Sequence, residues 1–595
     1  MTSMASAAAP LPRKTRILTS IVAAFFVALL VCGPMLEASL SERLFSLALV
    51  STAVVLTAFI TRRPAFALAL PCVLFGGVLI AAVVKFHYLQ TPLLAPDLVY
   101  FVNRDLIDVA FHYPPILAAL VAGIILIPGL LIFVWRLDRP VFLHRMPDRR
   151  QRWIRAAGVI ASVPLLLAID SPGGPFSEVF EKGMWQTMND KSYITDFFTS
   201  FFQTEIKIPV LATDADASLS WDQDPAGNPP ACATTPCTSS VALKQPQTHP
   251  DIISVLEEST FDPTMLAICN LPLCKHKMFQ PDGRTRAHGF LTVHVWGGGT
   301  WTSEFSLLTG LDHQTFGDAG LYAPYNLAPR VIHTLPRVLH DAGYRVIAIY
   351  PMSGDFINAR NAYRNYGFDQ FYDGQDYGLS WDSSDNDLMQ VFDRIYSDEK
   401  KAIGDQPLFV MMLTLRQHGP HMHPLNTQKA PYDKPLFPNK FSPKGLDEWM
   451  NLNLGNYLYR LEGSDAAVSH LEKILLDSDR PTVLFHFGDH QPSFDGALRD
   501  LQKIVPKSVP DPNFVTYYAL KSNFKPALKY DYPVFDLSFA GALILDVAGV
   551  KKDDFFAANA LMRERCNGAY LTCPDKRLLD AYQNEIFHTL GVLHD

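Results

Sequence analysis

The chain has 595 residues, of which 48% are hydrophobic and only 18% are charged, whereas an ordinary soluble domain carries about 25% charged residues. The 39 Phe, 22 Tyr and 8 Trp argue against bulk disorder. The net charge of −8 argues against a nucleic-acid partner, because such a partner requires a basic face. The composition therefore excludes a string of purely soluble domains.

Five long apolar runs lie before residue 170. They are Ile17–Leu36, Leu44–Ile60, Ala65–Val84, Ile116–Trp135 and Ile154–Ile169. A hydrocarbon core about 30 Å thick needs roughly 20 helical residues, and the short fifth run can be extended if the charged end of Arg155 reaches the interface. We therefore predict a transmembrane domain of five helices over residues 17–170. A cleavable signal peptide is the alternative interpretation of the first run.

Basic residues flank these runs unequally. One side carries eleven of them: Arg13, Lys14, Arg16, Arg62, Arg63, Arg136, Arg139, Arg145, Arg149, Arg150 and Arg152. The other side carries three, which are Arg43, Lys85 and Arg104. Because basic loops favour the cytoplasmic side, we expect residues 1–16 in the cytoplasm and everything after Asp170 outside.

Six of the eight cysteines form close pairs in this exported part. The pairs are Cys232 with Cys237, Cys269 with Cys274, and Cys566 with Cys573. An oxidising compartment would let each pair close a small loop. Zinc binding is the alternative, although none of the spacings is C-x2-C. We predict three local disulfides.

Residues 171–248 change character twice. Phe176–Ile208 interleaves Phe with charged residues, which suggests amphipathic helices on the bilayer surface. Helices packed on the exported domain are an equal alternative. Ala212–Gln247 is rich in Asp, Pro, Ser and Thr and is typical of a linker.

From residue 249 to 595, short apolar runs alternate with helix-like stretches such as Val331–Ala342 and Tyr457–Leu476. The predicted strands are Ile252–Leu256, Phe290–Val295, Arg345–Tyr350, Leu408–Leu413, Thr482–Phe487 and Leu537–Leu545. Continuously apolar strands are typical of a sheet buried on both faces, and the alternation predicts an α/β domain with a mostly parallel sheet. Ligands of such sheets bind beyond the carboxyl ends of the strands.

Chemically active residues follow several of these strands. They are Glu257-Glu258-Ser259-Thr260, Gly297-Gly298-Gly299-Thr300, Arg416-Gln417-His418-Gly419-Pro420 and Gly488-Asp489-His490. A carboxylate, an Asp-His pair and a hydroxyl can complete a four-ligand site, and oxygen and nitrogen ligands without sulfur suit Zn²⁺ or Mn²⁺. Coordination would favour the alkoxide of an otherwise inert Thr hydroxyl. The glycines would let the backbone approach a phosphate closely; a plain loop is the alternative.

In this order, Glu-Ser-Thr, Gly-Gly-Gly-Thr, His-Gly-Pro and Gly-Asp-His resemble the motifs of the alkaline-phosphatase/sulfatase superfamily. Within it, the chain is similar to membrane-anchored lipoteichoic acid synthases, glucan phosphoglycerol transferases and phosphoethanolamine transferases. The most specific segment is Thr300, followed by Ser303-Glu304-Phe305 and Leu307-Leu308-Thr309-Gly310. These families have five spans and an exported catalytic domain, here residues 249–595, so the resemblance covers nearly the whole chain.

The resemblance implies roles for particular residues. Glu258, Thr300, Asp489 and His490 match the family's metal ligands, and Thr300 also matches its nucleophile. Glu257 competes with Glu258, but the family places the ligand immediately before Ser, here Ser259. His418 matches a histidine that contacts the transferred headgroup.

The substrate-binding residues are a less direct match. Asn358 and Arg360 resemble the glycerol-phosphate segment of lipoteichoic acid synthases, but this chain reads Asn-Ala-Arg where the family has Asn-Arg, and a histidine expected nearby is missing. Tyr88–Leu94 with Asp97-Leu98 is similar to a loop of phosphoglycerol transferases. Trp296 and Trp301 flank the nucleophile and either stack on a sugar or simply pack, while His421 and His423 are expected to line the cleft.

The resemblance implies a metal-dependent transferase in the cell inner membrane with a periplasmic catalytic domain. It would use one Mn²⁺ or Zn²⁺ to move a phospholipid headgroup through a phospho-threonine onto a periplasmic glycan. The expected donor is phosphatidylglycerol. The alternatives are phosphoethanolamine transfer from phosphatidylethanolamine to lipid A or another glycan, a membrane-bound sulfatase or phosphodiesterase, and a non-catalytic glycan receptor. Thr300-Trp301-Thr302-Ser303 lacks the Pro and Arg of the sulfatase C/S-x-P-x-R segment, which counts against sulfate esters.

Overall fold

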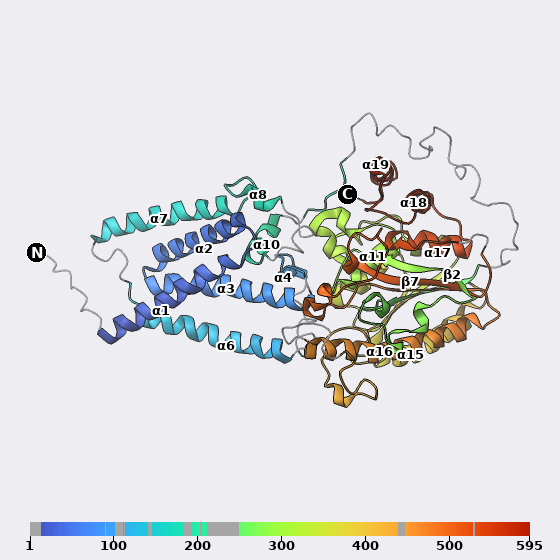
Figure 1. Ribbon diagram of the computed structural model, residues 1–595. Helices are drawn as coiled ribbons and strands as arrows, with labels where there is room; N and C mark the ends of the chain where they lie inside the picture. Colours follow the sequence, from blue (N-terminus) through green and yellow to red (C-terminus); the bar gives the residue numbers. More distant parts are fainter. Residues whose placement is uncertain are drawn as a thin grey trace, which may run out of the picture. The chain divides into compact units, whose positions relative to one another are not determined.

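The structure is a computed structural model of the chain (Figure 1). It describes residues 13–89, 91–100, 111, 114–140, 146–181, 192–202, 205–210, 249–437, 447–526 and 530–594. The chain divides into two compact units, a helical unit that ends at Glu205 and an α/β unit that continues from Ile206. The predicted linker and the Cys232–Cys237 pair lie outside the described residues.

The helical unit contains the five long apolar helices that the sequence predicts. In the described residues its helices are α1 (Arg13–Cys32), α2 (Leu40–Thr61), α3 (Pro64–Leu89), α4 (Asp97–Tyr100), α6 (Pro114–Leu137), α7 (Asp148–Ile169), α8 (Ser177–Phe180) and α10 (Ile194–Thr199), with short 3₁₀ turns at Pro34–Leu36 and Ser200–Phe202. Five of them are long and apolar enough to cross a membrane, over Ile17–Leu36, Leu40–Thr61, Pro64–His87, Leu117–Leu137 and Asp148–Ile169. This part of the predicted fold class is confirmed.

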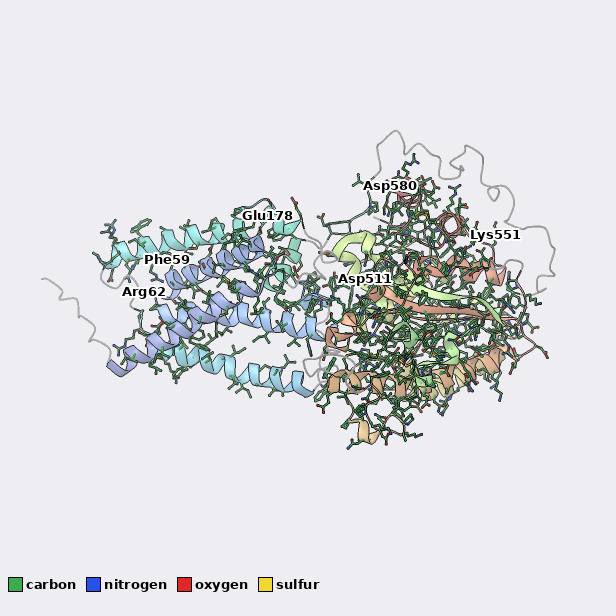
Figure 2. The ribbon with its side chains drawn as sticks, in the orientation of Figure 1. Phe59, Arg62, Glu178, Asp511, Lys551 and Asp580 are labelled. Carbon is green, nitrogen blue, oxygen red and sulfur yellow. A yellow bond between two sulfur atoms is a disulfide. The ribbon has the colours of Figure 1, made fainter. Side chains whose placement is uncertain are left out.

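The surface of these helices is itself apolar. On α6, Ile124, Ile125 and Leu126 are 75%, 66% and 67% exposed, and the side chains of this helix project away from its axis (Figure 2). Contiguous exposed apolar surface of this extent is typical of a membrane or protein interface.

The described residues between 176 and 202 pack within the helical unit, whereas Ile206 packs against the core of the α/β unit. Val179, Phe180 and Ile194 belong to the same apolar cluster as Phe45 of α2. The buried carboxylate of Glu37 accepts backbone hydrogen bonds at the start of α10, at 2.9 Å from the nitrogen of Ile194. The two sequence hypotheses, a helix on the bilayer surface and a helix on the exported domain, did not include this arrangement.

The α/β unit is built on one eight-stranded sheet. Its strands are β1 (Asp251–Glu257), β2 (Thr285–Thr292), β3 (Arg345–Tyr350), β4 (Gln370–Asp373), β5 (Leu408–Leu413), β6 (Thr482–Gly488), β7 (Val515–Ser522) and β8 (Val534–Asp536). They lie in the order β4-β3-β5-β1-β6-β7-β2-β8. Strand β7 is antiparallel to β6 and β2, and the other pairings are parallel. The predicted mostly parallel α/β sheet is confirmed.

Helices cover both faces of this sheet (Figure 1). The helices of the unit are α11 (Thr300–Thr309), α12 (Ala323–Asn326), α13 (Leu335–Asp341), α14 (Ala359–Tyr366), α15 (Asp385–Ile403), α16 (Asp447–Leu476), α17 (Ala540–Ala548), α18 (Asp554–Arg565) and α19 (Lys576–Asn584). Side chains alternate along β1, because successive residues of a strand point to opposite faces. Ile252 and Leu256 join the core under α11 and α17, whereas Ile253 and Val255 join the core under α15 and α16.

Two predicted strands differ from the structure. Leu537–Leu545 is helical, because it forms a short 3₁₀ turn and most of α17, and only Val534–Asp536 before it is a strand. A short, continuously apolar run fits a buried helix as well as a buried strand, so periodicity could not separate them. The run Phe290–Val295 lies at the end of a longer strand, β2, which begins at Thr285 and stops at Thr292.

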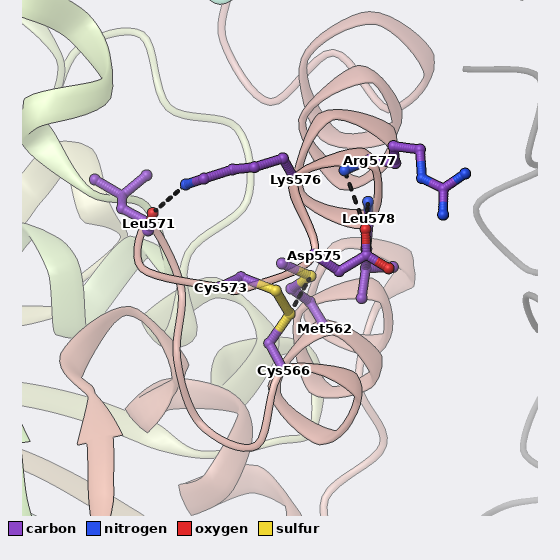
Figure 3. Close-up of a disulfide and its surroundings, with 8 residues drawn as sticks. All are labelled: Met562, Cys566, Leu571, Cys573, Asp575, Lys576, Arg577 and Leu578. Carbon is purple, nitrogen blue, oxygen red and sulfur yellow. Dashed lines mark hydrogen bonds between the residues drawn. A yellow bond between two sulfur atoms is a disulfide. The ribbon is translucent and has the colours of Figure 1, made fainter. Parts of the chain in front are cut away.

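Two of the predicted cysteine pairs form disulfides in the α/β unit. They are Cys269–Cys274 and Cys566–Cys573. Figure 3 shows the second, which joins the end of α18 to the turn before α19, where the Asp575 side chain caps the next helix by accepting from the nitrogen of Arg577. Each bridge therefore fixes a short irregular segment beside a helix.

Candidate active site

Two adjacent parallel strands bring the predicted acidic residues together. Strands β1 and β6 are paired with Glu257 opposite Gly488, so the residues that follow, Glu258 and Asp489, leave the same edge of the sheet side by side. Asp489 Oδ1 accepts a hydrogen bond of 2.7 Å from the backbone nitrogen of Ser259. The turn after β1 is thereby tied to the turn after β6.

The choice between Glu257 and Glu258 follows from strand geometry. The Glu258 carboxylate lies with Asp489 and His490, whose ligand atoms are all within 4.8 Å of one another. The Glu257 carboxylate instead accepts from the Thr414 hydroxyl at 3.3 Å. Neighbouring residues at a strand end face opposite sides of the sheet, so only Glu258 can join the cluster.

Thr300 reaches this cluster from the N-terminus of α11. Its Oγ1 donates to Glu258 Oε2 at 2.9 Å and lies 3.5 Å from His490 Nε2. Gly299 caps the helix with a φ of +92°, in the left-handed region that favours glycine. A Cβ at this position would lie 2.9 Å from a Val295 methyl carbon, so glycine is required there for shape as well as for backbone conformation.

The helix that carries Thr300 is anchored to the strand that carries Asp489. Ser303 Oγ, one turn along α11, donates to the backbone oxygen of Asp489 at 2.8 Å. Thr302 donates its hydroxyl to the backbone oxygen of Gly299 at 2.8 Å. The helix start that carries Thr300 is therefore held by side chains that do not themselves enter the cluster.

The cluster fits a divalent cation. Nδ1 of His490 lies 3.0 Å from the backbone oxygen of Gln491; since a carbonyl only accepts, Nδ1 carries the proton and Nε2 presents its lone pair. That Nε2 is 3.2 Å from Asp489 Oδ2 and 3.6 Å from Glu258 Oε1. Electron-pair donors that face one another at such distances need a proton or a metal cation between them. Two carboxylates, an imidazole and a hydroxyl are ligands that Zn²⁺ and Mn²⁺ accept.

Burial sets the protonation of this cluster. Burial, together with the nearby charge of Glu258, raises the pKa of Asp489 well above its ordinary value. Burial also lowers the pKa of His490, so its imidazole is neutral near pH 7. Without a cation, Asp489 therefore favours its protonated form, and a bound divalent cation would displace that proton.

His418 lies near the cluster on the loop after β5. Burial raises the pKa of the Glu258 carboxyl, but His490 and His418, when protonated, outweigh burial and lower that pKa. Nδ1 of His418 lies 2.7 Å from the oxygen of Gly419, so Nδ1 carries the proton and Nε2 is the available base. Arg460 of α16 holds this loop by donating to the backbone oxygen of His418 at 2.8 Å and to that of Pro420 at 2.9 Å.

The predicted headgroup residues make other contacts. Arg360 forms an ion pair of 2.6 Å with Asp373, at the end of β4. The Asn358 side chain donates to the oxygen of Pro324 at 3.0 Å, and Trp301 Nε1 donates to the oxygen of Leu321 at 2.6 Å. These contacts position loops around the carboxyl edge of the sheet.

The sequence did not predict where several aromatic and histidine side chains near the candidate site lie. Trp381, which the sequence analysis missed, lies with its ring centroid 4.9 Å from that of His418. Its position in a loop after β4 gave no periodic signal. Trp296 is fully buried, with the guanidinium of Arg499 4.3 Å from its ring, so it packs. His421 is buried as well.

Comparisons with known proteins agree with this geometry. A family model described as Sulfatase matches residues 250–533. An uncharacterized protein of Haemophilus influenzae is 30% identical over 377 residues, 60% of this chain and 64% of that protein. A Rhizobium meliloti protein named for cyclic β-1,2-glucan modification is 26% identical over 402 residues, 63% of this chain and 54% of that one. The chain thus spans less than two thirds of either relative.

The solved structures that this chain resembles are less similar to it in sequence. A Streptococcus pyogenes phosphoglycerol transferase, GacH, solved with sn-glycerol-1-phosphate, is 19% identical, with a TM-score of 0.43 over 58% of this chain and 86% of that one. The Listeria monocytogenes lipoteichoic acid synthase LtaP is 18% identical, with a TM-score of 0.38 over 52% and 74%. Residues 250–533 of this chain are therefore similar to sulfatase-family domains.

Proposed function

We propose that this protein is a metal-dependent phosphotransferase that moves a phospholipid headgroup onto a glycan through a phospho-Thr300 intermediate. The proposed donor is phosphatidylglycerol and the proposed headgroup is sn-glycerol phosphate. The observation that carries the proposal is the placement of the Thr300 hydroxyl 2.9 Å from Glu258, inside a buried cluster completed by Asp489 and His490.

The four side chains would hold one Mn²⁺ or Zn²⁺, which when bound would favour the alkoxide of Thr300 and offset negative charge on the phosphoryl oxygens. The protein contributes the orientation of each ligand. The Gln491 carbonyl fixes the tautomer of His490, and the Ser259 hydroxyl donates to Glu258 Oε1 at 2.7 Å. Partners of this kind orient metal ligands and raise their affinity.

In the first step, Thr300 Oγ1 attacks the phosphorus of the donor. A bond forms between Oγ1 and phosphorus, and the bond from phosphorus to the diacylglycerol oxygen breaks. The Oγ1 proton passes to Glu258 Oε2, to which it is already donated in the structure, while protonated His418 supplies a proton to the departing diacylglycerol. The first turn of α11 starts at Thr300, so the positive end of the helix dipole would face the negative phosphoryl group.

In the second step, a hydroxyl of the acceptor attacks the phosphorus and displaces Thr300. Nε2 of His418 takes the acceptor proton and so returns to its starting state, and Thr300 Oγ1 recovers its own proton from Glu258. Trp381, whose ring lies against His418, supplies an apolar wall of the kind on which sugar rings stack. The name of the Rhizobium meliloti relative supports a glucan as the acceptor.

We further propose that the α/β unit is periplasmic and that the helical unit anchors it in the inner membrane with the N-terminus inside. The five apolar helices and the unequal distribution of basic residues support this topology. A phosphatase reporter fused after residue 175 should be active and a cytoplasmic reporter at the same point inactive. The reverse result would contradict the topology.

The headgroup is tested by incubating the full-length protein with vesicles of phosphatidylglycerol, phosphatidylethanolamine or phosphatidylcholine, with Mn²⁺ and a β-glucan. We expect diacylglycerol release and glucan modification from phosphatidylglycerol vesicles only. Release from phosphatidylethanolamine vesicles alone would make the protein a phosphoethanolamine transferase. Release without modification of any glucan would favour a phosphodiesterase that uses water.

A further inference from the structure

A second buried group of acidic and histidine side chains lies at the same edge of the sheet. His294 follows β2 and sits between two carboxylates: its Nδ1 is 3.2 Å from Asp312 Oδ2, and its Nε2 is 3.1 Å from Asp536 Oδ2. All three side chains are buried. Since both ring nitrogens face carboxylates, both carry protons, and the imidazole is a buried cation held by two anions.

The three residues join segments on both sides of Thr300. His294 precedes the glycine loop that leads to Thr300. Asp312 lies two residues after Gly310, which caps the C-terminus of α11. The second carboxylate, Asp536, ends β8 and accepts from the nitrogen of Ser538 at 3.0 Å, at the turn that leads into α17. One imidazole therefore ties both ends of the nucleophile segment to the sheet.

Further contacts fix the geometry of this group. The Gln314 side chain donates to the backbone oxygen of His294 at 2.8 Å, and its backbone nitrogen donates to Asp312 Oδ1 at 2.8 Å. The two carboxylates raise the pKa of His294 to about 9, although burial acts in the opposite direction. The other titratable groups that interact with the three residues are His313, Tyr570 and Tyr582.

We propose that the Asp312–His294–Asp536 group is a clamp that holds the Thr300 segment in its reactive position, and that His294 is a positioning residue for the nucleophile. The catalytic part of this inference rests on the proposed function; the clamp itself rests on the contacts of the three residues. The clamp holds the segment whichever headgroup Thr300 accepts.

The clamp holds the segment between residues 295 and 312 in place only while His294 carries a positive charge. Loss of that charge leaves two buried carboxylates facing each other across a neutral ring, and the segment between residues 295 and 312 loosens. A small displacement of a nucleophile costs about 10- to 100-fold in rate. We therefore expect kcat to fall while the KM for the lipid donor changes little.

The test compares the full-length wild type with His294→Gln and Asp312→Asn, over pH 6 to 10. Transfer from phosphatidylglycerol vesicles is measured together with hydrogen exchange of the amides in residues 295–312, corrected for the intrinsic pH dependence of exchange. For His294→Gln we expect kcat to be reduced by about 10- to 100-fold and exchange of this segment to be at least about tenfold faster. In the wild type, activity and protection should both fall as the pH passes about 9.

His470→Gln is the matched control. His470 also pairs with a carboxylate, at 2.9 Å from Asp393, but both side chains are about two-fifths exposed and join α15 to α16. We expect it to leave kcat, the pH profile and exchange of residues 295–312 unchanged. Asp312→Asn removes one of the two anions that stabilise the imidazolium and should move the alkaline loss of protection to lower pH.

A folded His294→Gln variant with wild-type kcat, pH profile and segment exchange would overturn the clamp. If that variant does not fold, an Asp312→Asn variant with an unshifted profile would overturn it equally. If the wild type transfers no headgroup, the proposed function fails, and the exchange measurements alone decide whether the clamp exists. Exchange changes without a change in kcat would make the group structural only and would also contradict the positioning role.

Discussion

Two groups of the same residue types lie at one edge of the sheet, but their histidines differ in charge. Each buries two carboxylates beside a histidine. At the ends of β2 and β8, both nitrogens of His294 meet carboxylates, and its pKa rises to about 9. At the ends of β1 and β6, one nitrogen of His490 is occupied by a backbone carbonyl, and burial lowers its pKa.

The difference shows how one edge of a sheet can carry both a group that balances its own charge and a candidate metal site. The His294 group supplies its own cation and is complete without a ligand. In the other group a single backbone hydrogen bond, from His490 to Gln491, keeps the imidazole a donor of electron pairs. A cation from outside the protein would therefore supply positive charge that Glu258 and Asp489 can bind.

Removal of the nucleophile should have the largest effect. Among the described residues, Thr300 supplies the only hydroxyl of the proposed metal-ligand set. Thr300→Ala should therefore reduce headgroup transfer by at least about 10³-fold without unfolding the protein. Transfer is measured as diacylglycerol release from vesicles. Thr302→Ala removes the next hydroxyl on the same helix, which donates to the backbone oxygen of Gly299, and should stay within a few fold of wild type. Equal losses in the two variants would contradict the role of Thr300.

Removal of the proposed metal ion should have the next largest effect on transfer. It should affect the group of Glu258, Asp489 and His490 and not the group of His294. We expect a chelator, or Asp489→Asn, to reduce transfer by about 10²-fold or more and to lower the metal content measured by mass spectrometry. Because the pKa of Asp489 is raised, ionised Asp489 destabilises the metal-free fold, so metal-free Asp489→Asn should unfold at higher temperature than metal-free wild type near pH 7. A variant that kept its metal would show that Asp489 is not a ligand.

The contribution of the His294 group to stability should depend on pH and not on metal. Since the pKa of His294 is raised from 6.5 to about 9, its contribution to stability is complete below pH 6.5 and is lost as the pH rises through about 9. The contribution is of the order of 3 kcal/mol. It should appear as a fall in the free energy of urea unfolding over this range, with or without a chelator. Asp536→Asn should flatten this dependence; an unchanged slope would contradict the assignment of the charge.

The disulfide beside α18 should matter least to the chemistry. Cys566 and Cys573 are seven residues apart, and replacing both with Ser should lower the free energy of unfolding by about 2 kcal/mol. The loop that the bridge closes contacts the His294 group, since the nitrogen of Asp536 donates to the oxygen of Gly568 at 2.9 Å, so transfer activity should fall by no more than a few fold. Loss of activity in a variant that remains folded at the assay temperature would show that α18 and α19 support the site more directly than their contacts indicate.

The sequence predicts the centre of the fold better than its edges. Arg345–Tyr350 and Leu408–Leu413 have the predicted bounds, because continuously apolar strands in the middle of a parallel sheet are buried on both faces. Strand β7 (Val515–Ser522) was missed because Lys521 and Ser522 make it look mixed, and Leu537–Leu545 became a helix because its apolar run fits either structure.

In the candidate site, too, some contacts could be predicted from the sequence and others could not. The proximity of Glu258 and Asp489 follows from two parallel strands that end at one edge, and glycine residues before Thr300 marked a tight approach. The pairing of Arg360 with Asp373 and the contact of Trp381 with His418 depend on loops distant in the chain, for which no periodic pattern exists. The clamp at His294 was missed because its members, at positions 294, 312 and 536, follow no spacing that a motif could record.

The most direct test of the account is the mass of the peptide that carries Thr300. The full-length protein would be incubated with Mn²⁺ and phosphatidylglycerol vesicles without any glucan, so that the intermediate accumulates, and then digested for mass spectrometry. The account predicts a glycerol phosphate group on Thr300, which disappears when glucan is added. Headgroup transfer to glucan with Thr300 unmodified throughout would contradict it.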